Sequence, residues 1–127
     1  MDNSIAILIV NDSEYMRGYT KKALHRRGYY GDVIEAVDGK DALDRLMEHK
    51  VDLIISELHM PKVSGLDLVK AVSAHSALKE IPCMVLVSDT SEHCFQKAMD
   101  AGAAGYLKKP FTSSELDMKI KAMGKKE

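Results

Sequence analysis

The sequence lacks features that several common classes of protein require. Its two cysteines, Cys83 and Cys94, form neither a CxxC pair nor a zinc-binding spacing. None of its five histidines lies four residues from another histidine or from a cysteine, so a histidine metal site is not expected. The two cysteines are typical of reduced thiols in an intracellular protein.

Long apolar runs and a strong net charge are missing as well. The run IAILIV at residues 5–10 is too short for a signal-peptide core with its charged flank, and far too short for a membrane span. The formal net charge is -1, and we interpret the short basic runs in the first helix and the C-terminal tail as solvated faces. We therefore expect a cytoplasmic protein that binds neither nucleic acid nor membranes.

What the sequence does contain is a regular alternation of two patterns. The 127 residues, 46% of them apolar and 29% charged, suit one soluble domain over residues 1–127. Short apolar runs predict strands, and longer stretches with apolar residues at helical spacing predict helices. Strands are predicted at 5–10, 32–37, 51–56, 83–87 and 103–107, and helices at 14–27, from 38, at 64–76, at 91–102 and from 112. Five repeats of strand and helix indicate an α/β fold with a parallel sheet, right-handed crossovers and helices on both faces.

Each predicted helix has apolar residues that we expect to face the sheet. Ser64 is expected to cap the third helix, and Thr112 with Glu115 forms a capping box for the last one. The expected inward residues are Met16, Tyr19, Ala23, Leu24, Ala42, Leu43, Leu46, Met47, Leu66, Val69, Val72, Phe95, Ala98, Met99, Leu116, Ile120 and Met123.

Polar residues follow four of the five predicted strands. They are Asn11 and Asp12 after the first strand, Glu57 after the third, Ser88 after the fourth and Lys109 after the fifth. Each has a simple structural explanation: Asp12 or Ser88 could cap a helix, Glu57 could end a strand, and Lys109 could be a solvated loop residue. Their joint occurrence instead favours a site, because ligands of open α/β sheets bind outside the carboxyl ends of the strands.

These same segments resemble a known family. IVNDSE, DLIISELHMPKVSG, the strand end at Ser88 and GYLKKPF are similar to the CheY-like receiver domain of bacterial two-component response regulators, over residues 5–123. The resemblance implies a flavodoxin-like, doubly wound (βα)5 sheet with strand order 2-1-3-4-5. In that order, Asp12 and Glu57 would face each other across the point where the strand order reverses.

The resemblance also implies roles for these residues. Glu57 stands at the position of the phosphoacceptor aspartate, and Mg2+ would be held by Asp12, Glu57, the backbone carbonyl of His59 and, weakly through water, Asn11. A sensor histidine kinase or a histidine phosphotransfer protein would supply the phosphoryl group.

Further roles carried over by the resemblance concern the switch and the output. Ser88 would bond a phosphoryl oxygen, Lys109 would pair with it, and the Lys109–Pro110 bond is a candidate cis peptide, although trans is the commoner isomer. Ser88 and Tyr106 would relay the signal to a protein effector on the face of the last two helices and the fifth strand. That face would carry Phe95, Ala98, Ala104, Tyr106 and Lys108 and would suit a monomer or a weak homodimer.

Two site positions depart from the family pattern: Glu57 replaces the aspartate, and Asn11 replaces an acid. The extra methylene moves the carboxylate by roughly 1.5 Å, and a misplacement of about 1 Å can slow a positioned reaction on the order of a hundredfold. We expect weaker Mg2+ binding and impaired phosphorylation. Alternatively, Glu57 reaches toward Lys109 and Ser88 and mimics the phosphorylated state in part.

Two other classes of protein compete with a phospho-signalling receiver as interpretations of the sequence. A constitutive protein-interaction module could use the same fold without phosphate or metal. An enzyme is not expected: a haloacid-dehalogenase-type phosphatase needs a DxD after the first strand, and a flavodoxin-like flavin site needs a Ser/Thr/Gly-rich loop there. NDSE provides neither.

Overall fold

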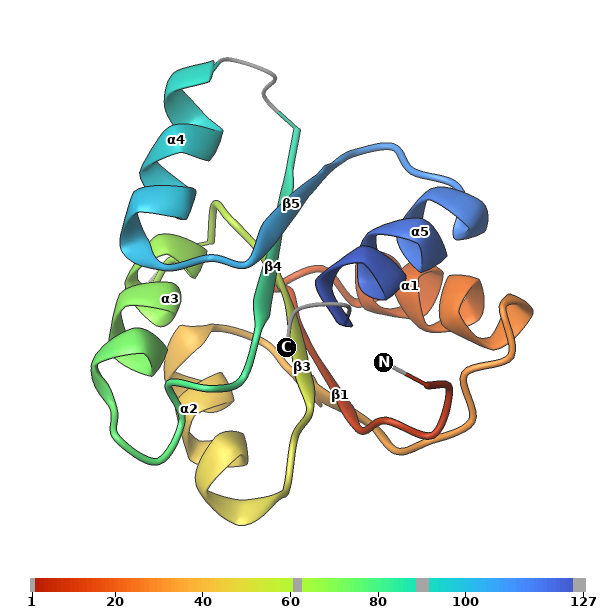
Figure 1. Cartoon of the computed structure of the whole chain (residues 1–127), viewed down its shortest axis with the longest axis horizontal. Helices are drawn as coiled ribbons and strands as arrows, with labels where there is room; N and C mark the ends of the chain where they lie inside the picture. Colours follow the sequence, from red (N-terminus) through yellow and green to blue (C-terminus); the bar gives the residue numbers. More distant parts are fainter. Residues whose placement is uncertain (1, 61–62, 89–91, 125–127) are drawn as a thin grey trace.

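The chain forms a central parallel sheet covered by helices on both faces (Figure 1). The computed structural model describes residues 2–60, 63–88 and 92–124. The elements are β1 (Ile7–Val10), α1 (Glu14–Arg26), β2 (Val33–Ala36), α2 (Gly39–Glu48), β3 (Leu53–Glu57), α3 (Gly65–Ala74), β4 (Cys83–Val87), α4 (Glu92–Ala101), β5 (Gly105–Lys108) and α5 (Ser113–Gly124). The sheet order is β2-β1-β3-β4-β5 with every pair parallel, so the predicted fold class and strand order are confirmed.

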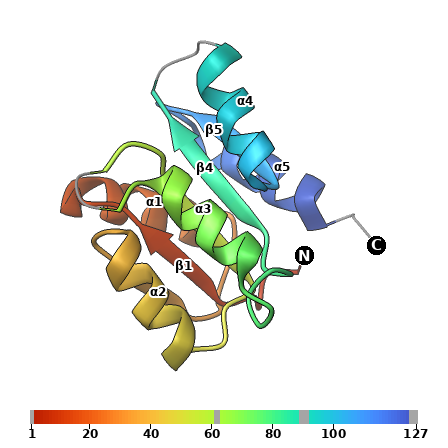
Figure 2. The ribbon, with the colours of Figure 1, turned by 90° about the vertical axis from the view of Figure 1, so that its left-hand side faces the viewer.

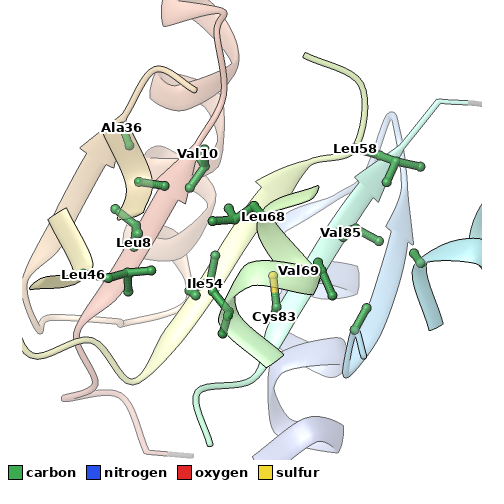
Figure 3. Packing of buried hydrophobic residues seen from close by; sticks show 14 of the residues in the cluster. Leu8, Val10, Ala36, Leu46, Ile54, Leu58, Leu68, Val69, Cys83 and Val85 are labelled. Atoms are coloured by element: carbon green, nitrogen blue, oxygen red, sulfur yellow. The ribbon is translucent and has the colours of Figure 1, made fainter. Parts of the chain in front are cut away.

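The core has two layers because successive strand residues point to opposite faces of the sheet. On one face, side chains such as Leu8, Ile54 and Val85 pack against α2, α3 and α4, with Leu68 and Val69 of α3 seated over the strands (Figure 3). The opposite layer lies under α1 and α5 and contains Ile7, Ile9, Leu24, Leu53, Ile55, Leu86, Phe111, Leu116 and Ile120. Figures 1 and 2 show this division, with α2, α3 and α4 on one side of the sheet and α1 and α5 on the other.

The helices α3 and α5 begin at residues whose side chains satisfy free backbone N–H groups. The Ser64 hydroxyl accepts from the Asp67 N–H at the start of α3. At α5, the Thr112 hydroxyl accepts from the Glu115 N–H, and the Glu115 carboxylate accepts from the Thr112 N–H. The predicted cap of the third helix and the predicted capping box are therefore confirmed.

Two predicted inward residues are wrong. Met47 is 64% exposed and Met99 is 38% exposed, whereas their neighbours Leu46 and Ala98 are buried. Adjacent residues of a helix point about 100° apart around its axis. The buried face of each helix is narrow, so it includes Leu46 and Ala98 but leaves Met47 and Met99 at its solvent-exposed edge. The side chain of Phe95 lies outside the described residues.

Several predicted boundaries differ by one or two residues: β1 begins at Ile7, β3 runs from Leu53 to Glu57, and β5 begins at Gly105. Among the described residues, none of the helices has the length and hydrophobicity needed to cross a bilayer.

The Cys83 thiol is free and buried at the start of β4, and burial raises its pKa to about 12. Since the thiolate is the nucleophile, the native thiol is expected to resist iodoacetamide at pH 8 and to react once the chain is unfolded. Peptide-resolved mass spectrometry measures the label at Cys83 separately from that at Cys94. Equal labelling of Cys83 in native and denaturing buffer would contradict its burial.

Candidate functional site

The sheet register brings three polar side chains to one face at the carboxyl ends of the strands. Ile9 pairs with Ile55, and the ladder continues past β1 because the Asn11 N–H donates to the Ala36 carbonyl. Asn11 therefore comes level with Glu57, on the face that carries α1 and α5.

Lys109 reaches the same face from the other side of β4. Its N–H donates to the Val87 carbonyl, which extends the ladder past β5, and it lies two residues beyond the inward-facing Leu107. Its side chain crosses the end of β4 to reach Glu57. The lysine precedes a cis peptide bond to Pro110, the isomer that the resemblance implied.

Glu57 receives two donors on a single oxygen. Its Oε1 lies 2.6 Å from the Lys109 Nζ and 3.3 Å from the Asn11 Nδ2. Glu57 is 6% exposed, and the Lys109 side chain is 21% exposed. An ion pair withdrawn this far from water is held more firmly than a surface pair, and each partner depends on the other to offset its lost hydration.

The surroundings of Asn11 fix its orientation. Its Oδ1 accepts from the Ser13 N–H at 2.9 Å, which leaves the amide nitrogen to face Glu57. The Arg17 guanidinium donates to the Asn11 carbonyl at 2.7 Å and to the Glu35 carboxylate at 2.9 Å. This hydrogen bond from Arg17 is the main reason that the pKa of Glu35 lies below its usual range.

Asp12 is exposed, and among the described residues its carboxylate has no hydrogen bond or ion pair. The capping interpretation of Asp12 is wrong, because Ser13 is the N-cap of α1 and accepts from the Met16 N–H. His59 is also exposed, two residues after Glu57. Asp12 directly follows the buried Asn11, and His59 lies two residues after the buried Glu57, but Asp12 and His59 are both exposed at the surface.

The two predicted switch residues differ in their surroundings. Ser88 is exposed immediately after β4, and no hydrogen bond joins it to Glu57. Tyr106 in β5 is half-buried against the core beneath α2, α3 and α4, and the Lys119 ammonium lies 4.9 Å from the centre of its ring.

The oxygen donors present are a poor match for a divalent ion. The described residues include no group of three His, Cys, Asp or Glu side chains positioned to hold a metal. Glu57 Oε1 already accepts two hydrogen bonds, and the Asn11 amide presents its nitrogen to the pocket. Mg2+ requires oxygen ligands in nearly octahedral geometry, so this arrangement disfavours it.

Sequence reasoning missed two residues that shape the site. Arg17 belongs to the basic run that we expected to be a solvated face, yet its side chain is 14% exposed and holds the Asn11 carbonyl. Gly65 allows α3 to approach β3 closely, and its N–H donates to the Leu58 carbonyl at 2.9 Å. The segment PKVSG contains the glycine, but nothing local in the sequence reveals the approach of the two backbones.

Gly65→Ala is expected to destabilise the fold and disturb the end of β3. A Cβ on residue 65 would lie 2.1 Å from the Glu57 carbonyl oxygen and 2.9 Å from the Leu58 Cα, so backbone must move. We expect a loss of about 2 kcal/mol or more in the free energy of unfolding, measured with urea. Gly18→Ala is the control: it has open space in α1 and should stabilise by up to about 1 kcal/mol. Equal stability of Gly65→Ala and wild type would contradict the close approach.

The fold and the site define a class of signalling protein. Residues 7–121 match the response regulator receiver domain, and the chain belongs to this family. It is a CheY-like receiver of two-component signalling, a class of signalling proteins rather than classical enzymes. Receivers of this family typically bind Mg2+ at an acidic pocket and interact with histidine kinases and downstream effectors.

Individual relatives agree over almost the whole chain. The chain is 36% identical over 118 residues to the chemotaxis protein CheY1 of Helicobacter pylori, covering 92% of this chain and 94% of that protein. It is 32% identical over 120 residues to CheY-3 of Vibrio cholerae, covering 94% and 92%. The structure of the chemotaxis response regulator CheY4 of Vibrio cholerae superposes with a TM-score of 0.85 at 34% identity, covering 94% of this chain and 98% of that one.

Proposed function

We propose that this protein is a receiver that controls a protein partner through a phosphorylation-type conformational switch, with an acceptor position altered to Glu57. The observation that carries the proposal is the 2.6 Å contact between Glu57 Oε1 and Lys109 Nζ in a mostly buried site. The Glu57 carboxylate already pairs with the Lys109 ammonium, which would otherwise pair with a phosphoryl oxygen. The site is therefore impaired in phosphorylation, or it mimics the phosphorylated state without a kinase.

The mimicry is partial for reasons of charge and shape. One carboxylate carries one negative charge and two oxygens, whereas a phosphoryl group carries about 1.5 to 2 charges and three oxygens. Glu57 engages Lys109 but makes no hydrogen bond to Ser88. We infer a receiver held in one state by the lysine contact, with the Ser88 and Tyr106 part of the switch engaged less fully than by phosphate.

Impaired acceptance follows from geometry and from the metal. The Glu57 oxygen that faces Lys109 is already bound by two donors, which lowers its nucleophilicity. Mg2+ binding would use Asp12, Glu57 and the His59 carbonyl, with Asn11 through water, and it is weakened because two of these four positions depart from the family pattern. Phosphoryl transfer depends on positioning and charge neutralisation, both of which are reduced here.

The proposed partners are those of a cytoplasmic receiver. A sensor histidine kinase or a histidine phosphotransfer protein lies upstream, and a protein effector binds the face formed by α4, β5 and α5. The chain acts as a monomer or a weak homodimer. The alternative is a constitutive interaction module, favoured by the pairing of Glu57 with Lys109, because this pairing engages the ammonium that a phosphoryl oxygen would otherwise bind. Beryllofluoride with Mg2+ separates the two: a receiver shows NMR shifts near Ser88 and Tyr106, and a constitutive module shows none.

The direct test is to incubate the wild-type chain with acetyl phosphate and Mg2+ and to measure acid-labile phosphate by intact mass. We expect little or no adduct. Ready labelling at Glu57 would refute the impaired acceptor. A pull-down with wild type, Glu57→Asp and Glu57→Ala then identifies partners that depend on the Glu57–Lys109 contact.

A further inference from the structure

The amide of Asn11 occupies a position where an acid would be repelled. Its nitrogen lies 3.3 Å from Glu57 Oε1, and both residues are buried, with 2% and 6% of their surfaces exposed. An aspartate at position 11 would bring a second carboxylate oxygen to the same place. Two carboxylates that close and that poorly hydrated repel strongly unless a cation or a proton lies between them.

The orientation of this amide is imposed by the chain around it. The Ser13 N–H needs an acceptor and finds the Asn11 Oδ1 at 2.9 Å, so a flipped amide would set a nitrogen against that N–H. Arg17 holds the backbone of the same residue through its carbonyl at 2.7 Å. Glu35 in turn holds Arg17, at 2.9 Å. The donor end of the amide is thereby directed at Glu57.

We propose that Asn11 is the positioning residue that makes this pocket independent of a divalent cation. Its amide N–H and the Lys109 ammonium together neutralise Glu57, and they replace the cation that an acid at position 11 would require. The inference rests on the proposed function, since it gives the carboxylate at the altered acceptor position two donors from the chain itself. Whether residue 11 is an amide or an acid then decides whether the site needs Mg2+ to be stable.

The test is the effect of Mg2+ on thermal unfolding of wild type and Asn11→Asp, followed by circular dichroism because the chain has no tryptophan. In EDTA, Asn11→Asp is expected to lower Tm by about 5 °C or more. Millimolar Mg2+ should restore most of that loss, since a ligand that binds the folded state stabilises it. Wild-type Tm should change by less than about 1 °C between the two buffers, at matched ionic strength. A wild-type response as large as that of Asn11→Asp would overturn the proposal.

Ser13→Ala is the matched control. It removes the hydroxyl that caps α1 but keeps the backbone N–H that orients Asn11. Its Tm should fall equally with and without Mg2+. A Mg2+-dependent Tm for Ser13→Ala would show that Mg2+ acts on general stability, and it too would overturn the proposal.

A second measurement covers the case in which Asn11→Asp does not fold. The side-chain amide signals of Asn11 in wild type, followed by NMR, should move only slightly when Mg2+ is added, because binding at this site is weakened, and displacement that saturates at millimolar Mg2+ overturns the proposal. Labelling by acetyl phosphate is a separate readout. Ready labelling of wild type would refute the proposed function, whereas the Tm series tests the role of Asn11.

Discussion

Glu57→Asp is expected to convert a chain that accepts little or no phosphoryl group from acetyl phosphate into one that is labelled on the order of a hundredfold faster. Shortening the side chain by one methylene withdraws the carboxylate by roughly 1.5 Å from its 2.6 Å contact with Lys109. The ammonium is then free to pair with a phosphoryl oxygen, and the carboxylate returns to the length that the family uses. Restoration is expected to be partial because Asn11 remains.

The measurement is the rate of acid-labile mass gain with acetyl phosphate and Mg2+. Glu57→Gln is the control, because it keeps the length of Glu57 and one acceptor oxygen but has no nucleophilic carboxylate. A Glu57→Asp chain that folds and remains as unreactive as Glu57→Gln would show that the methylene is not what limits the reaction. Adding Asn11→Asp to Glu57→Asp should raise the rate further, because it restores the second acid at the metal site.

Lys109→Met is expected to cost about 2 to 4 kcal/mol of the free energy of unfolding. The substitution keeps the apolar stem but leaves the Glu57 carboxylate 6% exposed and without its cation. Removing one partner of a buried pair costs about 3–5 kcal/mol, and the lower range applies here because the Lys109 side chain is 21% exposed. Urea unfolding monitored by circular dichroism gives the change as a shift in midpoint at constant m-value.

Two controls separate the loss of the pair from a general effect of removing a lysine. Lys40→Met disrupts a surface pair with Asp44, whose side chains are 78% and 65% exposed, and should change stability by less than about 0.5 kcal/mol. Glu57→Gln combined with Lys109→Met should lose less than Lys109→Met alone, because no charge is then left buried. A single Lys109→Met variant as stable as wild type would mean that the contact contributes little.

Much of the fold was predictable because local patterns and the final structure agree. The β3 residues Leu53–Ile55 are buried on both faces of the sheet, which is why they read as a continuous apolar run. Caps such as Ser64 and Thr112 work through neighbours three residues away, so they are visible in the sequence. Met47 and Met99 were misplaced because helical spacing finds a stripe but not the point at which neighbouring elements stop covering it.

The sequence predicts which residues form the site better than it predicts the contacts between them. Glu57 and Lys109 lie at the carboxyl ends of different strands, and a parallel sheet brings these ends to one edge, so their contact could be expected. The Asn11 contact could not, because the direction of an amide depends on the Ser13 N–H and on Arg17, one turn along α1. The role of Gly65 could not be predicted for a similar reason, because it depends on close contact with the backbone of Glu57 and Leu58 at the end of β3.

The bridge from Glu57 to Lys109 passes over the end of β4 and joins residues 52 positions apart. It can form only after β5 has added to the edge of the sheet. During synthesis the β1 to β3 segment leaves the ribosome well before residue 109, since the chain grows from its N-terminus at about 5–20 residues per second. Until then the carboxylate at the end of β3 has no ammonium beside it, so the pocket is among the last parts of the molecule to mature.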